Sequence, residues 1–346
     1  MNNGCKLEWG DDALLNFETY LIDLSSNFLC YSLSKRVFWT EILFLLAGLK
    51  VVDVFKKLAI FLSLLFSLTG CSQNEYSQLK ISATTWVGYS PLFYAKEKGW
   101  LDDLNIKLLH VVSLSENMYL FEAGNADAYV GTQYEYSLLI EKDPSLMPVM
   151  LFDRSYGGDI ILSNVSLAEL QNTSETIDAY LEMDSINSTL LKDFIPHYGL
   201  EGKKIQYINR DQATLSSLKA GELSRPSLLV TYTPYDIQLE KQGFAEVAST
   251  KDGLNLLVVD ALFTRESSLN KHRKQFEELK KLVNKATEAL KQNPQEFYTT
   301  IKPYMLELSY EEFVQSLDSI VWINSGISPE LEERIQELGF PIRGLI

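Results

Sequence analysis

Short apolar runs alternate with amphipathic stretches along residues 79–263. The short runs predict strands at 79–85, 106–112, 126–131, 146–153, 160–163, 176–183, 205–208, 228–232 and 254–263. The stretches between them, bounded by capping residues, Gly or Pro, predict helices at 91–98, 118–123, 133–142, 167–170, 188–198, 212–220 and 234–242. Strands that alternate with helices indicate parallel sheets covered by helices, so the pattern predicts an α/β fold.

The residues after 263 are predicted to be purely helical. A single apolar stripe with spacings of three and four is formed by Phe276, Leu279, Leu282, Val283, Ala286, Ala289 and Leu290. Pro294 opens a second helix, and Ser309 followed three residues later by Glu312 predicts a capping box at the start of a third. Pro329 opens the last helix, which we expect to end before Gly339.

A different apolar run, residues 58–68, follows two lysines and ends in Leu68-Thr69-Gly70-Cys71. A basic flank, a short apolar core and small residues are typical of a secretory signal, and the run is too short to span a membrane. The final cysteine resembles the lipobox of bacterial lipoproteins, in which the cysteine is acylated and becomes the new N-terminus. We therefore expect a lipoprotein signal peptide at 54–70, lipidation of Cys71 and a tether at 71–78.

Residues 1–53 are a doubtful N-terminal extension, because a leader of 70 residues is far longer than a signal peptide needs. A second apolar stretch at 38–52 is interrupted by Glu41 and Lys50, and a membrane segment there stays an alternative. We interpret residues 1–50 as untranslated, with the true start near 51–55.

Net charge and cysteine positions argue against a nucleic-acid partner and against an internal disulfide. The net charge of −15 disfavours a nucleic-acid partner, which would require clustered Lys and Arg. Two of the three cysteines, Cys5 and Cys30, precede the expected cleavage point, so the mature chain cannot form an internal disulfide. We expect a monomer whose stability comes from its core.

No enzyme or cofactor motif is found in the sequence. The three histidines, His110, His197 and His272, lack the spacing of metal ligands. The sequence contains neither a nucleophile elbow nor a Walker loop. We therefore expect no metal, no cofactor and no enzymatic activity.

Several segments, in order, resemble one family of binding proteins. These segments are Trp86 to Leu101, with the sequence WVGYSPLFYAKEKGWL, and residues 124–128, 153–160, 256–265 and 289–297. Together they resemble the substrate-binding proteins of the nitrate, sulfonate, taurine and thiamine-precursor class, which serve ABC importers. The resemblance implies a type II periplasmic-binding-protein fold with two Rossmann-like lobes, a hinge and a helical C-terminal tail. It also implies lobe 1 at 79–158 plus 257–346 and lobe 2 at 159–256, with a ligand that closes the hinge by touching both.

Most candidate ligand-binding residues follow the predicted strands, where helix N-termini point in this class of fold. Asp153 and Asp159 precede the crossover strand at 160–163. The candidates are Trp86, Gly88, Tyr89, Ser115, Gln133, Asp153, Asp159, Asp184, Ser185 and Tyr232. Each has a plain structural alternative as a core aromatic, a helix cap or a turn residue. Because the candidate loops contain more acidic than basic side chains, we expect a neutral or cationic ligand. The counter-argument is that helix N-termini bind anions without basic side chains.

These features predict an extracytoplasmic, lipid-anchored solute-binding protein. It would lie on the periplasmic side of a bacterial membrane, or on the outer surface of a Gram-positive cell. It would deliver a small polar organic ligand to an ABC permease and ATPase. One alternative is a sensor lipoprotein that signals to a membrane receptor, which the neighbouring genes would distinguish. Another is an enzyme similar to thiamine-pyrimidine synthase, whose cysteine-rich motif is missing after Cys71.

Overall fold

The computed structural model describes residues 76–251, 254, 256–342 and 345–346, which belong to one compact unit. The expected extension, the signal peptide, Cys71 and tether residues 72–75 lie outside the described residues. The end of the tether is bound to the fold. The carbonyl of Tyr76 accepts a hydrogen bond from Asn105 at 2.9 Å, and that of Ser77 accepts one from Gln275 at 3.0 Å.

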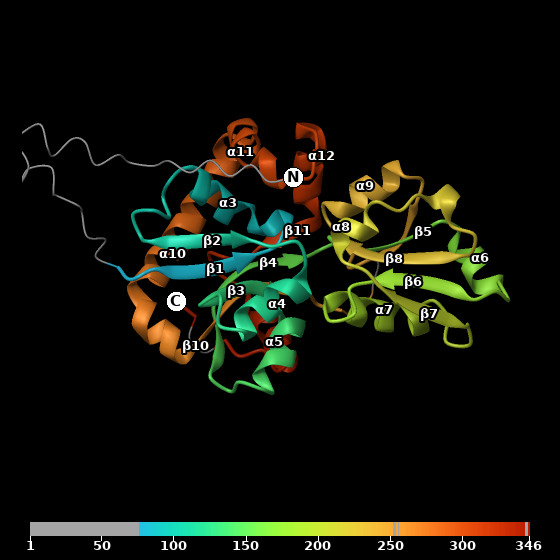
Figure 1. Ribbon diagram of the computed structural model, residues 1–346, viewed down its shortest axis with the longest axis horizontal. Helices are drawn as coiled ribbons and strands as arrows, with labels where there is room; N and C mark the ends of the chain where they lie inside the picture. Colours follow the sequence, from blue (N-terminus) through green and yellow to red (C-terminus); the bar gives the residue numbers. More distant parts are fainter. Residues whose placement is uncertain (1–75, 252–253, 255, 343–344) are drawn as a thin grey trace, which may run out of the picture. The chain divides into compact units, whose positions relative to one another are not determined.

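Six strands form the first sheet of the described residues (Figure 1). Their spatial order is β11 (Ile320–Trp322), β4 (Leu146–Ser155), β10 (Val259–Arg265), β3 (Ala128–Thr132), β1 (Leu79–Ala83) and β2 (Ile106–His110). β1 pairs in parallel with β2 and β3, whereas β10 is antiparallel to both β3 and β4. Because β1 and β3 are buried along nearly their whole length, helices must cover both faces of this sheet.

The second sheet repeats this arrangement with five strands. Their spatial order is β7 (Ile205–Asn209), β6 (Ile177–Leu181), β8 (Ser227–Tyr232), β5 (Asp159–Ser163) and β9 (Ala245–Ser249). β6 is parallel to β7 and β8, and β5 is antiparallel to β8 and β9. Both sheets therefore place one antiparallel strand between their third and fourth parallel strands.

Two segments connect the sheets: the short link from β4 to β5 and the longer link from β9 to β10. They are hydrogen-bonded to each other, with 2.8 Å between Ser155 Oγ and Thr250 Oγ1 and 3.0 Å from Thr250 N to the carbonyl of Asp159. Gly157 in the short link has a φ of +100°, a conformation that side chains disfavour. The paired links are the natural place for any rotation of one sheet against the other.

Helices surround both sheets. Those that follow strands of the first sheet are α3 (Ser90–Glu97), α4 (Leu114–Glu122), α5 (Gln133–Ile140), α10 (Glu266–Gln292), α11 (Pro294–Ile301), α12 (Tyr310–Ser316) and α13 (Pro329–Glu337). Those of the second sheet are α6 (Leu167–Asn172), α7 (Ile186–His197), α8 (Gln212–Leu215) and α9 (Tyr235–Lys241). Short 3₁₀ turns are η2 (Val87–Tyr89), η3 (Ala220–Glu222), η4 (Lys302–Tyr304) and η5 (Leu317–Ser319). Within the described part of the chain, no helix is both long and apolar enough to cross a bilayer.

The helical tail matches its sequence pattern in most respects. In the predicted stripe of α10, the side chains with at most 4 % exposure are Phe276, Leu279, Val283, Ala286 and Leu290. The burial of each large side chain in this set stabilises the folded state by roughly 1.5–3 kcal/mol. The predicted capping box of α12 is confirmed, since Ser309 and Glu312 each accept a hydrogen bond from the other's backbone N–H.

Three strand predictions were wrong. The strand expected at 254–263 begins only at Val259, where pairing with Arg154 of β4 starts. The apolar residues before it, such as Leu254 and Val258, pack into the cores as part of the link between the sheets. β9 was missed, and the tail is not purely helical, because β11 pairs with the end of β4. Both are edge strands, for which tertiary pairing outweighs a weak local pattern.

Two helix boundaries were also wrong. The helix expected at 118–123 begins at Leu114, because Ser113 caps it by accepting from Glu116 N. The helix expected at 212–220 ends at Leu215. There Ser216 and Ser217 donate to backbone carbonyls three residues back, which competes with continuing the helix.

Candidate functional site

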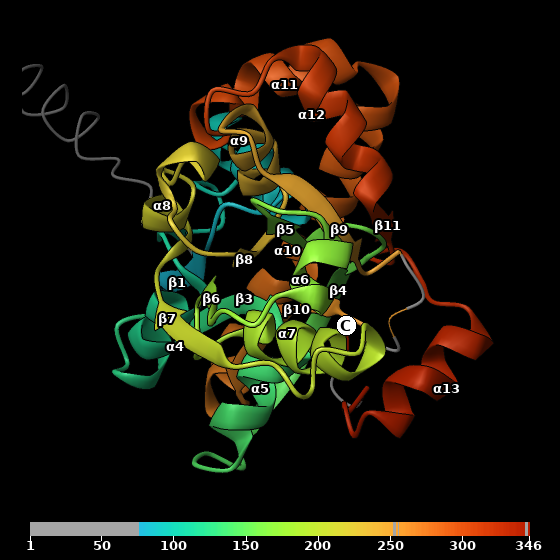
Figure 2. The ribbon, with the colours of Figure 1, turned by 90° about the vertical axis from the view of Figure 1, so that its right-hand side faces the viewer.

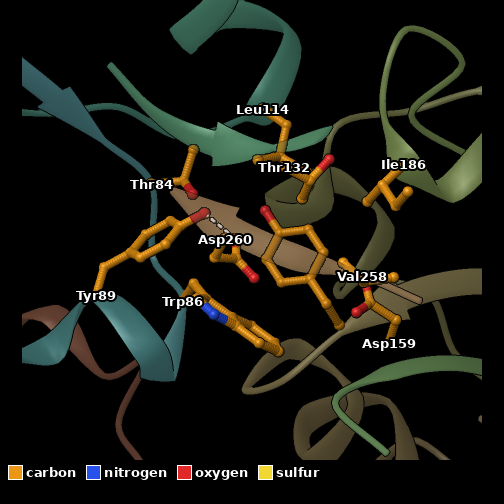
Figure 3. A pocket seen from close by; sticks show the side chains of 10 residues that line it. Thr84, Trp86, Tyr89, Leu114, Thr132, Asp159, Ile186, Val258 and Asp260 are labelled. Atoms are coloured by element: carbon orange, nitrogen blue, oxygen red, sulfur yellow. Dashed lines mark hydrogen bonds between the residues drawn. The ribbon is translucent and has the colours of Figure 1, made fainter. Parts of the chain in front are cut away.

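Side chains from both sheets line a small pocket (Figure 3). The lining residues are Thr84, Trp86, Tyr89, Leu114, Thr132, Asp159, Ile186, Tyr232, Val258 and Asp260. The space among them is about 10 Å³, roughly enough for one water molecule. The described conformation is therefore closed, and a larger ligand requires the two sheets to separate.

Strand register brings the polar residues of the site together. On the first sheet, Thr132, Asp260 and Asp153 are successive cross-strand partners on β3, β10 and β4. On the second sheet, Asp159 of β5 is the partner of Tyr232 of β8. Residues far apart in the sequence thus form one polar row on each sheet, and the two rows meet at the pocket.

Trp86 lies between these rows and is held from several sides. Its indole Nε1 donates to Asp153 Oδ1 at 3.1 Å, and its ring is 6.0 Å from that of Tyr232, edge to face. A Cβ atom on Gly88 would lie 2.0 Å from Asp153 Oδ2, and one on Gly158 would lie 2.4 Å from Trp86 Cη2. Only glycine at these two positions leaves room for the indole and its carboxylate partner.

The carboxyl groups of the site have strongly shifted acidities. Burial raises the pKa of Asp159 to about 7 and that of Asp153 to about 8. Burial, then repulsion from Asp153, raises the pKa of Asp260 well above its usual range. The hydroxyl of Tyr89 donates a hydrogen bond to Asp260, as the dashed line in Figure 3 marks, which works in the opposite direction.

Two glutamates, Glu135 and Glu182, each approach the start of a helix that belongs to the other sheet. Glu135 of α5 accepts from Thr132 N at 2.8 Å and, across the pocket, from Ile186 N at the start of α7 at 3.0 Å. Glu182 follows β6 and faces the N–H of Leu114 at the start of α4, although its oxygens form no hydrogen bond. Burial raises the pKa of Glu182 to about 8. Each half thus presents a carboxyl group to a helix N-terminus of the other.

Six of the ten candidate residues from the sequence lie at the pocket or directly behind it. Trp86, Tyr89, Asp159 and Tyr232 line it. Asp153 is behind Trp86, and the backbone of Gly88 packs against both.

The other four candidates lie in the surrounding walls. Gln133 donates to the carbonyl of Leu257 in the β9–β10 link and accepts from Val259 N, at the start of β10, at 2.9 Å. Ser185 is fully buried and caps α7, and Ser115 lies beside the cap of α4, with 3.4 Å between its Oγ and that of Ser113. Asp184 accepts from the hydroxyl of Tyr119 at 2.7 Å, a contact between the two halves.

Sequence reasoning missed Asp260, Glu135 and Glu182. A signal for Asp260 was present, because it is the one charge in the apolar run of residues 256–263. Glu135 is the third residue of α5 and forms a capping box with Thr132, which indicates a local role only.

A second, larger cavity of about 590 Å³ shares no lining residue with the first. It lies beside α9 and α12, which are adjacent in Figure 2 and are joined by an ion pair of 2.6 Å between Lys241 and Glu312. Asp236 lines this cavity, and burial raises its pKa to about 7. Among the residues that the structure describes, no group of His, Cys, Asp and Glu is arranged to hold a metal ion.

Comparison with known proteins identifies related sequences and folds. The family model described as "NMT1/THI5 like" matches residues 86–297. No curated protein matches the chain. Among solved structures, the ligand-binding component of an ABC-type import system from Staphylococcus aureus, with zinc bound, is 16 % identical, with a TM-score of 0.59. The match covers 76 % of this chain and 91 % of that one.

Two further structures show the same similarity. The periplasmic aliphatic sulphonate-binding protein SsuA from Escherichia coli is 14 % identical, with a TM-score of 0.58, over 76 % of this chain and 91 % of that one. The periplasmic nitrate-binding protein NrtA from Synechocystis PCC 6803 is 16 % identical, with a TM-score of 0.53, over 70 % of each chain. At these identities the similarity establishes the fold, and the predicted periplasmic-binding-protein fold is confirmed.

Proposed function

Since the chain belongs to the NMT1/THI5-like family, we propose that it is a solute-binding protein of an ABC import system. It captures a small polar organic ligand between two lobes and delivers it to a permease and its ATPase. Lobe 1 comprises residues 79–158 and 257–346, and lobe 2 comprises residues 159–256. We further propose an extracytoplasmic location, with the protein anchored through lipidated Cys71.

The observation that carries this proposal is a pocket lined from both sheets, next to two links that join them. A ligand at such a place contacts both lobes and stabilises their closed arrangement. The neighbours of known fold support the same class, because two of them are named as sulphonate- and nitrate-binding proteins.

We propose binding rather than catalysis. The enzyme alternative, a synthase of thiamine pyrimidine, depends on a cysteine-rich motif. The three cysteines of this chain are Cys5, Cys30 and Cys71, and none falls in the matched range 86–297. A sensor role differs from import in its partner, so uptake of labelled ligand by cells lacking the protein distinguishes the two.

The proposed ligand contacts are Trp86, Tyr89, Asp159 and Tyr232. Gly88 and Asp153 would act through Trp86, whose position they determine. The described contacts of Ser115, Gln133, Asp184 and Ser185 support a role in shaping and closing the pocket, so a change there would alter ligand affinity indirectly.

Replacing Trp86 with alanine is expected to weaken ligand binding roughly tenfold to hundredfold, since it removes an aromatic face and the hydrogen bond that orients Asp153. A thermal-shift screen of sulfonates, nitrate, pyrimidines, amino acids and polyamines identifies the ligand, and calorimetry measures its affinity. The control is Trp100→Ala, because Trp100 packs on Tyr94 and Lys285 outside the pocket. Equal affinity in the wild type and Trp86→Ala would show that the ligand binds elsewhere.

Replacing Cys71 with alanine is expected to abolish lipidation and release the protein from the membrane fraction, because one or more acyl chains supply the anchor. Mass spectrometry should find a lipid-modified N-terminal peptide that begins at Cys71 in the wild type alone. A Cys71→Ala protein that stays membrane-bound and equally processed contradicts the anchor.

A further inference from the structure

Two buried carboxyl groups line the pocket and three more lie around it, and no described cationic side chain forms an ion pair with them. Glu135, Asp153, Asp159, Glu182 and Asp260 are each at most 3 % exposed. None of the five takes part in an ion pair within the described part of the chain. Burying a carboxylate without a positive partner is costly. So many at one place indicates that a positive charge from outside the chain completes the site.

Polar atoms that point into the pocket also lack partners. Asp159 Oδ2 and the hydroxyl of Tyr232 are buried, line the pocket and form no hydrogen bond with any described residue. Asp153 Oδ2, directly behind Trp86, is in the same state. Native proteins leave few buried polar atoms without a partner. An ionised carboxylate can only accept hydrogen bonds, so Asp159 requires a donor from the ligand.

Two helix N-termini that could favour an anion face carboxyl groups, and one of them already donates to its carboxyl group. Anions in this kind of fold bind at helix N-termini. The N–H of Ile186 at the start of α7 donates to Glu135, and the start of α4 faces Glu182. A nitrate or sulfonate would therefore meet two carboxyl groups at the places where it needs free N–H groups.

We propose that the ligand is a small organic cation with N–H donors, such as a protonated amine or an amidine. Its charged group lies between Asp159 of one lobe and Asp260 of the other, where Figure 3 shows both side chains facing the pocket. Its apolar part lies against Trp86 and Tyr232, whose rings are 6.0 Å apart and form an aromatic wall for a cation. This inference rests on the proposed function, because it takes the pocket as the site of the solute.

Charge-matched probes test the inference directly. Benzylamine, putrescine and agmatine are compared with benzyl alcohol, 4-aminopyrimidine, ethanesulfonate and nitrate, by thermal shift and calorimetry at pH 8 and low salt. The protein is purified as the cell processes it. We expect at least one cationic probe to raise the melting temperature and to bind with 1:1 stoichiometry, and we expect benzyl alcohol and both anions to have no effect.

A matched pair of variants tests whether Asp159 provides the negative charge that binds the cation. Asp159→Asn is expected to weaken binding of the active cation at least tenfold, since it removes the charge but keeps the shape. Asp236→Asn is the control and should leave the affinity within twofold, because Asp236 is similarly buried, at 8 % exposure, but lines the other cavity. Equal loss in both variants would overturn the assignment to Asp159.

The pH dependence provides an independent readout. The titratable groups that interact with Asp159 are Glu135, Asp153, Asp260 and Tyr232. Burial raises the pKa of Asp159 to about 7, so protons compete with a cation below neutrality. The affinity for the active cation should rise between pH 5.5 and pH 8, and an affinity that falls over this range overturns the inference.

The remaining outcomes distinguish a failure of the cationic-ligand proposal from a failure of the proposed solute-binding function. Binding of a sulfonate, of nitrate or of neutral 4-aminopyrimidine, with no response to any cation, overturns the cationic ligand and leaves the solute-binding function in place. No response to any probe of any charge overturns both.

Discussion

The ligand-free protein is expected to melt at a temperature roughly 10 °C lower at pH 8 than at pH 5. The cause is the set of buried carboxyl groups, since burial raises the pKa of Asp159 and Asp236 to about 7 and that of Asp153 and Glu182 to about 8. In the unfolded chain such groups titrate near 4.

The direction follows from which state binds more protons. At pH 5 the folded protein keeps protons that the unfolded chain has lost, and this difference stabilises the fold. That stability is lost as the pH rises through the folded-state pKa values of about 7 and about 8. For one group such as Asp159, the part of this shift that lies between pH 5 and a pKa of about 7 corresponds to on the order of 3 kcal/mol, or roughly 10 °C for a chain of this size.

Other groups with shifted pKa values either titrate outside pH 5–8 or have a small, opposite effect on stability within it. Hydrogen bonds to Ser145 and Arg265 lower the pKa of Asp143, and a hydrogen bond from Lys98 lowers that of Glu296, so these groups lose their contribution only in more acidic solution. Burial lowers the pKa of His110, which adds a small stabilisation as the pH rises towards 7. Because several buried carboxyl groups oppose the effect of this one histidine, the carboxyl groups determine the direction of the change in stability.

Calorimetric melting at pH 5, 6, 7 and 8, at constant ionic strength and after removal of bound small molecules, measures this effect. Asp159→Asn should show a smaller fall in melting temperature between pH 5 and pH 8 than the wild type. A melting temperature that is constant or rises over this range contradicts the protonated, buried carboxyl groups.

Replacing Gly88 with alanine is expected to cost about 1–3 kcal/mol of stability, the usual price of overpacking a core. The added Cβ would lie 2.0 Å from Asp153 Oδ2 and 2.4 Å from Trp86 Nε1, so the hydrogen bond between these two side chains cannot persist. Because Trp86 forms one wall of the pocket, ligand affinity should fall by roughly tenfold or more as well.

The matched control is Gly202→Ala, at an exposed position where a Cβ has no neighbour within 4 Å. Urea denaturation and calorimetric titration compare the two variants with the wild type. Gly88→Ala with the stability and affinity of Gly202→Ala would show that Trp86 can move without consequence, contrary to the packing described above.

Much of the fold was predictable from the sequence because it depends on neighbours along the chain. The apolar stripe of α10 and the capping box of Ser309 and Glu312 rest on residues three and four apart, and both were correct. The strand predictions failed where a partner from elsewhere in the chain decides whether a strand forms. β11 exists only because the end of β4 has a free edge beside it.

The same distinction between local pattern and tertiary pairing applies to the candidate site. The sequence by itself determined that Trp86 and Tyr89 follow a strand, that Tyr232 ends one and that Asp159 precedes one, at the strand ends where this kind of fold binds ligands. Only the tertiary structure decided that Asp260 lies beside Asp153, because this depends on the antiparallel pairing of β10 with β4.

The contact of Glu135 with the start of α7 is the clearest case. Locally, Glu135 belongs to the capping box of its own helix, and nothing in its neighbourhood indicates a second partner. The bond to Ile186 joins residues 51 positions apart, on helices of different sheets. Local patterns follow from short-range geometry and determine the elements. Electrostatics in a closed pocket depends on which distant side chains share it, so only the folded arrangement could show that this site is acidic and that the start of α7 donates to one of its carboxyl groups.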